Sequence, residues 1–272
     1  MRPFQVRLRL ALLTLFGLAA VGGVLLAQKP FREYAGWEYN HFPLPEDWQE
    51  KAEWTRARLR YTPVNIHGMF DHVNRWTVDY PRSDRHLLQG IRRLTRIHTR
   101  SVEQPVDLDG TDDIYNWPFV YAVEPGYWRL SDDEAAQLRD YLLRGGFFMC
   151  DDFHGTVEWD NFMVGMQKVF PDRPVVDIDN KDAIFHVIYD LDDRFQVPGM
   201  QWTQTGSLYE YDGFEAKWRG IYDNKGRIVA AICHNMDLGD AWENSDDPRY
   251  PEKWASLAYR IAANYAMYDL TH

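Results

Sequence analysis

Two apolar runs that each lead into acids and a histidine constrain the fold of this chain most strongly. Residues 147–150 lead into segment 151–154, which holds two aspartates and a histidine. Residues 227–233 lead into segment 234–243, which holds a histidine, an amide, several carboxylates and a tryptophan. In open parallel sheets, ligands bind outside the carboxyl ends of the strands. The pattern therefore predicts one polar crevice at the edge of a parallel sheet.

Strand-like runs alternate with segments of helical periodicity along the chain. Residues 119–123 form a further apolar run, and the pair Ser131 and Glu134 has the spacing of a capping box. A helix is expected near 160–170, and a closing helix near 251–267. Alternation of this kind gives right-handed crossovers and a mostly parallel sheet with helices on both faces. We predict an α/β fold, a flavodoxin-like three-layer sandwich with a mostly parallel central sheet. The runs at 119–123, 147–150 and 227–233 are its expected interior strands.

The N-terminus has the features of an export signal. Arg2, Arg7 and Arg9 precede an uncharged run over residues 10–27. Positive charge before an apolar segment directs that segment into the membrane with its N-terminus inside. We expect residues 1–28 to be a signal peptide or a membrane anchor, residues 29–54 a linker or arm, and residues 55–272 the folded domain. The expected location is the bacterial cell envelope, either on the periplasmic side of the inner membrane or exported.

The charge balance excludes one class of partner. The net charge is -11, and the first 28 residues contribute three positive charges, so the remainder carries -14. Such an acidic body repels phosphate backbones, and the sequence contains no basic stripe. We expect no nucleic acid partner. A hydrophobic content of 45% supplies enough apolar material for a large core.

The chain has two cysteines, Cys150 and Cys233, and each ends an apolar run. Export permits a disulfide between them. Either residue can equally serve as a small buried hydrophobe. A catalytic thiol is disfavoured because a nucleophile elbow needs small neighbours, whereas Met149 and Asp151 flank Cys150.

The strand-end residues are the candidates for chemistry. The catalytic candidates are Asp151, Asp152 and His234. A hard divalent cation would fit oxygen ligands from Asp151, Asp152 and Asp237. The wider set of expected ligand-binding residues is His154, Asn235, Asp237, Asp240, Trp242, Glu243 and Asp84. The alternative is structural, since aspartates also cap helices and accept hydrogen bonds from loop amides. Trp76 and Tyr80 form either a sugar-stacking surface or part of the core.

No known catalytic motif in the sequence identifies a reaction. The sequence contains no His-Glu-x-x-His, Gly-x-Ser-x-Gly, Walker or Gly-x-Gly-x-x-Gly motif. Zincins, ordinary serine hydrolases, P-loop enzymes and dinucleotide binders are therefore disfavoured.

Several ordered blocks resemble one bacterial family. They are residues 79–84 with 94–97, 142–147 with 151–153, 184–186 with 189–191, and 235–243. Together they resemble the family catalogued as domain of unknown function 4159, over roughly residues 55–272. The resemblance implies a class I glutamine-amidotransferase-like, flavodoxin-type domain in exported or membrane-anchored envelope proteins. It also implies MoxR-type ATPase and von Willebrand A-type systems as partners. The cysteine elbow that this fold normally carries is absent here.

Two classes of function remain open. The first is a non-catalytic envelope domain that binds a small polar ligand, a glycan or a protein partner. The second is a hydrolase that uses a metal or a carboxylate–histidine pair. We expect Asp151 and Asp152 to share one crevice with His234 and Asp237, and the hydrolase class requires this arrangement, whereas the binding class does not.

Overall fold

The computed structural model describes residues 31–34, 41–68 and 74–272. The expected signal or anchor at residues 1–28 lies outside this part of the chain. Among the described helices, none combines the length and the apolar character needed to cross a bilayer.

The described chain alternates strands and helices, as predicted. The strands are β1 (Arg56–Leu59), β2 (Thr62–Pro63), β3 (Gln104–Val106), β4 (Phe119–Val123), β5 (Trp128–Arg129), β6 (Phe147–Asp151), β7 (Val176–Asp177), β8 (Lys217–Tyr222) and β9 (Ile228–His234). The α-helices are α2 (Arg82–Leu94), α3 (Asp132–Leu143), α4 (Gly155–Val169), α5 (Trp202–Thr205), α6 (Leu238–Glu243) and α7 (Glu252–Thr271).

The central sheet has seven strands in the order β3-β1-β4-β6-β9-β8-β7. The first five are parallel to one another, whereas β8 is antiparallel to both of its neighbours. Numbered along the chain, the five parallel strands lie in the order 2-1-3-4-5. The prediction of a mostly parallel sheet with β4, β6 and β9 inside it is confirmed.

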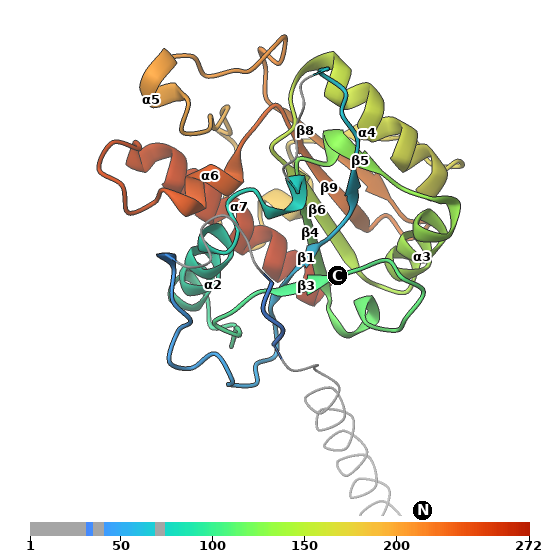
Figure 1. Ribbon diagram of the computed structural model, residues 1–272, viewed down its shortest axis with the longest axis horizontal. Coiled ribbons are helices and arrows are strands. Elements are labelled where there is room, and N and C mark those ends of the chain that lie inside the picture. The colour runs from blue at the N-terminus through green and yellow to red at the C-terminus, as the bar shows by residue number, and fades with distance from the viewer. Residues whose placement is uncertain (1–30, 35–40, 69–73) are drawn as a thin grey trace, which may run out of the picture.

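Helices cover both faces of the sheet (Figure 1). Helices α2, α6 and α7 pack on one face, where they bury residues such as Leu88, Trp242 and Ile261. Helices α3 and α4 pack on the other face, where they bury residues such as Leu138 and Phe162. The core is thus divided into two layers by the sheet.

Local signals set the ends of the helices on the α3/α4 face. Ser131 caps α3 through the predicted capping box, in which its side chain accepts from the Glu134 amide. Helix α4 begins at Gly155, so the predicted start near 160 was wrong. The first turn of α4 buries Glu158, which is 2% exposed, instead of an apolar residue. Hydrophobic periodicity could not detect that turn.

The two cysteines lie on opposite faces of the sheet. Cys150 on β6 pairs in register with Ile232 on β9, so the next residue, Cys233, points the other way. Cys150 packs in the core layer of α3 and α4, and Cys233 in the layer of α2, α6 and α7. Both are free thiols.

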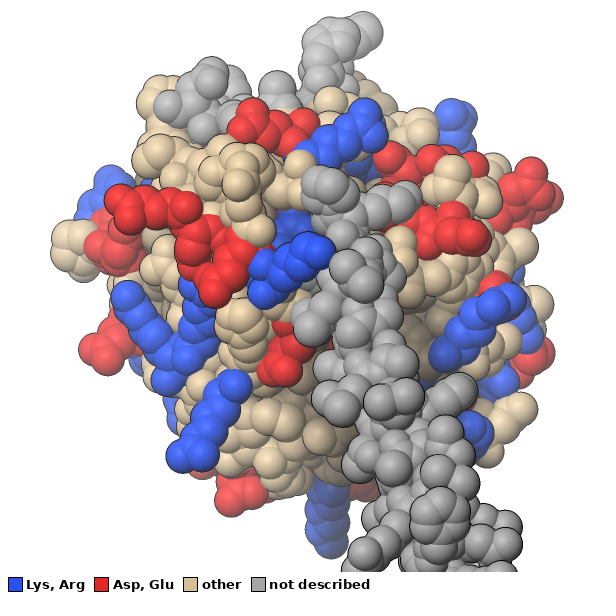
Figure 2. Space-filling view, turned by 90° about the horizontal axis from the view of Figure 1, so that it is seen from below, with Lys and Arg blue, Asp and Glu red and all other residues tan. Residues whose placement is uncertain are grey.

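The expected arm and aromatic surface contribute to the packed fold. Ala52 and Trp54 are buried, and Trp54 belongs to the core. Trp76 and Tyr80 are also buried, so they offer no stacking surface for a sugar. On the face in Figure 2, basic and acidic side chains are interspersed over the described surface.

Candidate functional site

Unusual backbone conformations gather at the carboxyl ends of the parallel strands. Glu124 follows β4 with φ 46°, Asp152 follows β6 with φ 54°, and Asn235 follows β9 with φ 64°. Asp79, in the turn before α2, has φ 58°. Such values are uncommon for residues other than glycine and concentrate at functional sites.

Backbone hydrogen bonds tie these strand ends together. The Glu124 amide donates to the Asp151 carbonyl at 3.1 Å, and the Asp152 amide donates to the Met236 carbonyl at 2.8 Å. The Asn235 amide donates to the Phe153 carbonyl at 3.0 Å. The edge is therefore a fixed frame for the side chains that follow each strand.

Three aspartates meet within this frame. One carboxylate oxygen from each of Asp79, Asp152 and Asp237 lies within 4.8 Å of the other two. Asp152 is 9% exposed and Asp237 is 5% exposed. Asp237 caps α6, where its Oδ1 accepts from the Asp240 amide at 2.7 Å. We call Asp79, Asp152 and Asp237 the aspartate cluster.

Burial and mutual repulsion raise the pKa of every member of the aspartate cluster. For Asp79, Asp152 and Asp237 the largest cause is loss of solvation, and neighbouring carboxylates add to it. Arg58 opposes the rise in the pKa of Asp79. Removing water destabilises the charged carboxylates, and a cation bound beside them would stabilise that charged form.

Two glycines allow the carboxylates to approach the backbone closely. A Cβ at Gly239 would lie 2.4 Å from Asp79 Oδ2, and a Cβ at Gly199 would lie 2.4 Å from Asp237 Oδ2. Any side chain at either position would collide with the aspartate cluster. The site therefore depends on glycine for space.

Asp151 lies at the same edge but has a structural role in this geometry. Tyr121 donates to its Oδ1 at 2.6 Å, and the amides of Leu238 and Gly239 donate to its Oδ2 at 2.7 and 3.0 Å. Burial raises the pKa of Asp151, while Tyr121, Arg56 and the two amides oppose that rise. Its two oxygens already accept hydrogen bonds from Tyr121 and from the first amides of α6. The third aspartate of the cluster is therefore Asp79, where the sequence predicted Asp151.

Of the other expected ligand residues in segment 234–243, some stabilise the fold and others lie near the aspartate cluster. Asn235 links α4 to the segment before β8, because its Oδ1 accepts from Gly155 N and its Nδ2 donates to Glu215 O. Trp242 is fully buried in the core. Asp240 and Glu243 form a group with Asp79 whose ligand atoms also lie within 4.8 Å. Asp240 accepts from Asn244 Nδ2 at 3.0 Å and from the Met200 amide.

His154 extends the site on the other side of Asp152. Its Nε2 lies 3.3 Å from Asp152 Oδ1 and 3.9 Å from Glu210 Oε1. His154 is 4% exposed, and its Nδ1 has no hydrogen-bond partner in the described part of the chain. Glu210 comes from the segment before β8, which starts at this edge because β8 runs antiparallel to β9.

His234 is held as a neutral ring. Its Nε2 lies 3.2 Å from the Gly155 carbonyl, and Arg219 Nη1 lies 3.3 Å from its Nδ1. Burial, with Arg219 in support, lowers the pKa of His234 to about 3. Both ring nitrogens are engaged, so His154 is better placed than His234 for acid–base work beside Asp152.

Asp84 does not lie with these groups. It is fully buried and forms ion pairs with Arg56 at 3.0 Å and with Arg58 at 2.8 Å. Its expected place among the ligand-binding residues therefore conflicts with its position in the fold. Both guanidinium groups also lie over the ring of Tyr121. Asp84, Arg56, Arg58 and Tyr121 therefore form one buried network, which we call the Asp84 network.

Sequence reasoning missed Asp79 and Glu210. Asp79 reaches the site from the turn before α2, and Glu210 from the segment before an antiparallel strand. Neither follows a parallel strand, whereas every residue expected at the site except Asp84 lies at or just after the end of such a strand. The block at 79–84 carried a signal for the first residue, whereas Glu210 had none beyond its tyrosine neighbours.

Exposed aromatic side chains lie beside Glu210. Tyr209 is 44% exposed and Phe214 is 61% exposed, and their rings meet edge to face at 4.7 Å. Tyr211 stacks on His67 at 4.5 Å. Asp212 fastens this segment to the start of α4 by accepting from the Thr156 amide and hydroxyl at 2.9 and 2.8 Å. We call residues 208–214 the aromatic segment.

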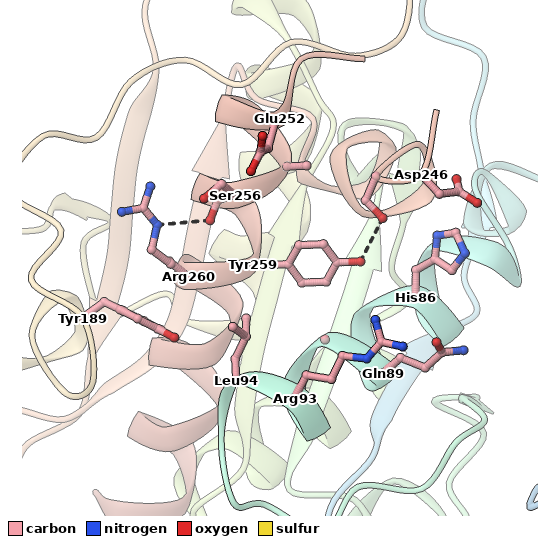
Figure 3. A pocket seen from close by; sticks show the side chains of 13 residues that line it. His86, Gln89, Arg93, Leu94, Tyr189, Asp246, Glu252, Ser256, Tyr259 and Arg260 are labelled. Atoms are coloured by element: carbon pink, nitrogen blue, oxygen red, sulfur yellow. Dashed lines mark hydrogen bonds between the residues drawn. The ribbon is translucent and has the colours of Figure 1, made fainter. Parts of the chain in front are cut away.

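A separate groove of about 660 Å³ lies between α2 and α7. Figure 3 shows Tyr259 at its centre, with Arg93 and Arg260 on either side. The aspartate cluster does not line this groove. The buried carboxylates and the strained backbone both lie at the carboxyl edge, so we place the candidate site there.

The fold and site together define an α/β domain with a carboxylate-lined site at the carboxyl ends of its parallel strands. The chain belongs to the family described as Domain of unknown function (DUF4159), whose model matches residues 56–270. The resemblance seen in the sequence blocks is confirmed by this match. No curated protein matches the chain.

Proposed function

We propose that this domain binds a polar, uncharged ligand, a glycan of the bacterial cell envelope, at its carboxyl edge without transforming it. The observation that carries the proposal is the aromatic segment, in which exposed rings flank Glu210, whose carboxylate lies 3.9 Å from the buried His154. Four large hydrophobic side chains are at least 42% exposed within it: Leu208, Tyr209, Tyr211 and Phe214. Exposed apolar groups that gather in this way mark binding surfaces.

The side chains at the edge suit this ligand class. Carboxylate oxygens accept hydrogen bonds from hydroxyl groups. Aromatic rings offer apolar faces to the C–H surface of a sugar. A polyhydroxylated neutral ligand satisfies both kinds of group.

The wider context of the proposal comes from the sequence and from the strand order. The order 2-1-3-4-5 with helices on both faces supports a flavodoxin-like fold of the glutamine-amidotransferase-like type. The arginines before the apolar run at 10–27 support export or anchoring on the periplasmic side of the membrane. MoxR-type and von Willebrand A-type proteins are the partners that the family resemblance suggests.

Removal of the exposed rings should weaken sugar binding. We expect the full-length chain to bind at least one of chitotetraose, cellotetraose and maltotetraose in calorimetry. The double variant Tyr209→Ala, Phe214→Ala should bind it at least about tenfold more weakly, which corresponds to about 1.4 kcal/mol. The matched control is Tyr115→Ala, since Tyr115 is 37% exposed and hydrogen-bonds Asp140 of α3. No binding of any of the three sugars, or equal binding by the double variant, would reject the proposal.

Hydrolysis is the second candidate function. The contact between Asp152 Oδ1 and His154 Nε2 at 3.3 Å favours it, because such a pair can move a proton. Release of smaller sugars from the same oligosaccharides would support hydrolysis over binding alone.

A further inference from the structure

We infer that the carboxyl edge holds two divalent cations, with Asp152 as the bridging ligand between them. One position is formed by Asp79, Asp152 and Asp237, and the other by Asp152, His154 and Glu210. In each group the ligand atoms lie within 4.8 Å of one another. The inference concerns the site of the proposed function and rests on it for location only.

Two buried atoms in these groups lack the partners that burial normally requires. Asp79 Oδ2 is buried and forms no hydrogen bond with any described residue. His154 Nδ1 is in the same condition, on a side chain that is 4% exposed. Buried polar atoms are hydrogen-bonded in the great majority of cases. The Asp79 oxygen indicates a missing partner at the first position. At the second position His154 turns Nε2 toward the acids, 3.3 Å from Asp152 Oδ1 and 3.9 Å from Glu210 Oε1.

The nearby cationic side chains have other partners. Arg58 pairs with Asp84, and its Nη1 donates to the carbonyls of Trp76 and Val78 at 3.1 and 2.9 Å. Arg75 donates to Glu124 at 2.7 Å. Among the described residues, no ion pair joins Arg58 to the aspartate cluster. The charge of the cluster is therefore available for an external cation to offset.

The charge count favours two cations over one. Asp79, Asp152, Asp237 and Glu210 bring four carboxylates to the two overlapping groups. One divalent cation offsets only two of these charges, and Asp240 and Glu243, which form a third group with Asp79, add to the excess. Repulsion among buried carboxylates is strong because little water separates them.

The two positions differ in chemistry. Carboxylate oxygens alone suit Mg²⁺, Ca²⁺ and Mn²⁺, so the aspartate cluster is a hard site. The group with His154 combines two carboxylates, which suit Mn²⁺, with an imidazole, which suits Zn²⁺. Manganese fits both donor sets, and it is the probe of choice.

Equilibrium dialysis of the full-length chain against MnCl₂ at pH 7.5, followed by elemental analysis, tests the inference. We expect two manganese ions per chain in the wild type and in the control Asp160→Asn, which alters an exposed acid on α4. Asp237→Asn and Glu210→Gln should each retain one, and Asp152→Asn should retain none. Electron paramagnetic resonance should show coupled manganese ions only in the wild type and the control.

One or no ion per wild-type chain would overturn the inference, and so would two ions in Asp152→Asn. Folding of each variant is checked by circular dichroism, and these amides should fold because they remove buried charge. The readout needs no sugar, so its failure is distinguishable from failure of the proposed function.

Discussion

The cation-free protein should lose stability as the pH rises from 5 to 8. The folded-state pKa values of Asp79, Asp152 and Asp237 lie above their ordinary values, chiefly because of burial. The folded state thus retains protons that the unfolded state has released. The resulting stabilisation is complete in acid and is lost as the pH passes the folded-state values, at about 1.4 kcal/mol for each unit of pKa elevation.

Urea unfolding at several pH values measures the slope of the free energy of unfolding against pH. Asp269 contributes in the same direction, because burial raises its pKa to about 7. Asp269→Asn removes that contribution and keeps an oxygen that can accept from Trp54 Nε1. In the Asp269→Asn background, Asp237→Asn should reduce the remaining slope. Mn²⁺ at about 100 times its dissociation constant should add about 2.7 kcal/mol at pH 8 for each ion that binds. A stability that increases steadily up to pH 8 would contradict the account.

Asp84→Asn should destabilise the protein by about 3–5 kcal/mol. The change leaves the guanidinium groups of Arg56 and Arg58 buried without their shared carboxylate. The matched control is Asp246→Asn, which breaks the 2.7 Å pair with Arg82 at a position where the Asp246 side chain is 61% exposed. Exposed pairs contribute about 0–1 kcal/mol, so the control should change stability little. Equal effects of the two substitutions would show that the buried ion pairs of Asp84 do not stabilise the fold more than an exposed pair does.

The sequence predicted the fold where a regular pattern controls it. β4, β6 and β9 are apolar up to the closing Asp151 of β6 and His234 of β9, as is typical of strands buried on both faces. The parallel arrangement then brings Asp152 and Asp237 to one edge, although 85 positions separate them.

The pattern could not determine how each acid is used. Asp151 and Asp152 are neighbours, yet Asp151 turns toward the amides of α6 while Asp152 turns toward Asp79 and Asp237. That difference depends on the positive φ of Asp152, which no periodicity encodes. Asp84 was misplaced for a related reason, since its position at the start of α2 gave no sign of two buried arginines on β1.

The most direct test of the central claim is a crystal structure of the full-length chain grown with MnCl₂ and measured at the manganese absorption edge. The account predicts two anomalous peaks at the carboxyl edge, one among Asp79, Asp152 and Asp237 and one among Asp152, His154 and Glu210. The absence of any peak at these side chains, with manganese bound only elsewhere on the protein, would contradict it.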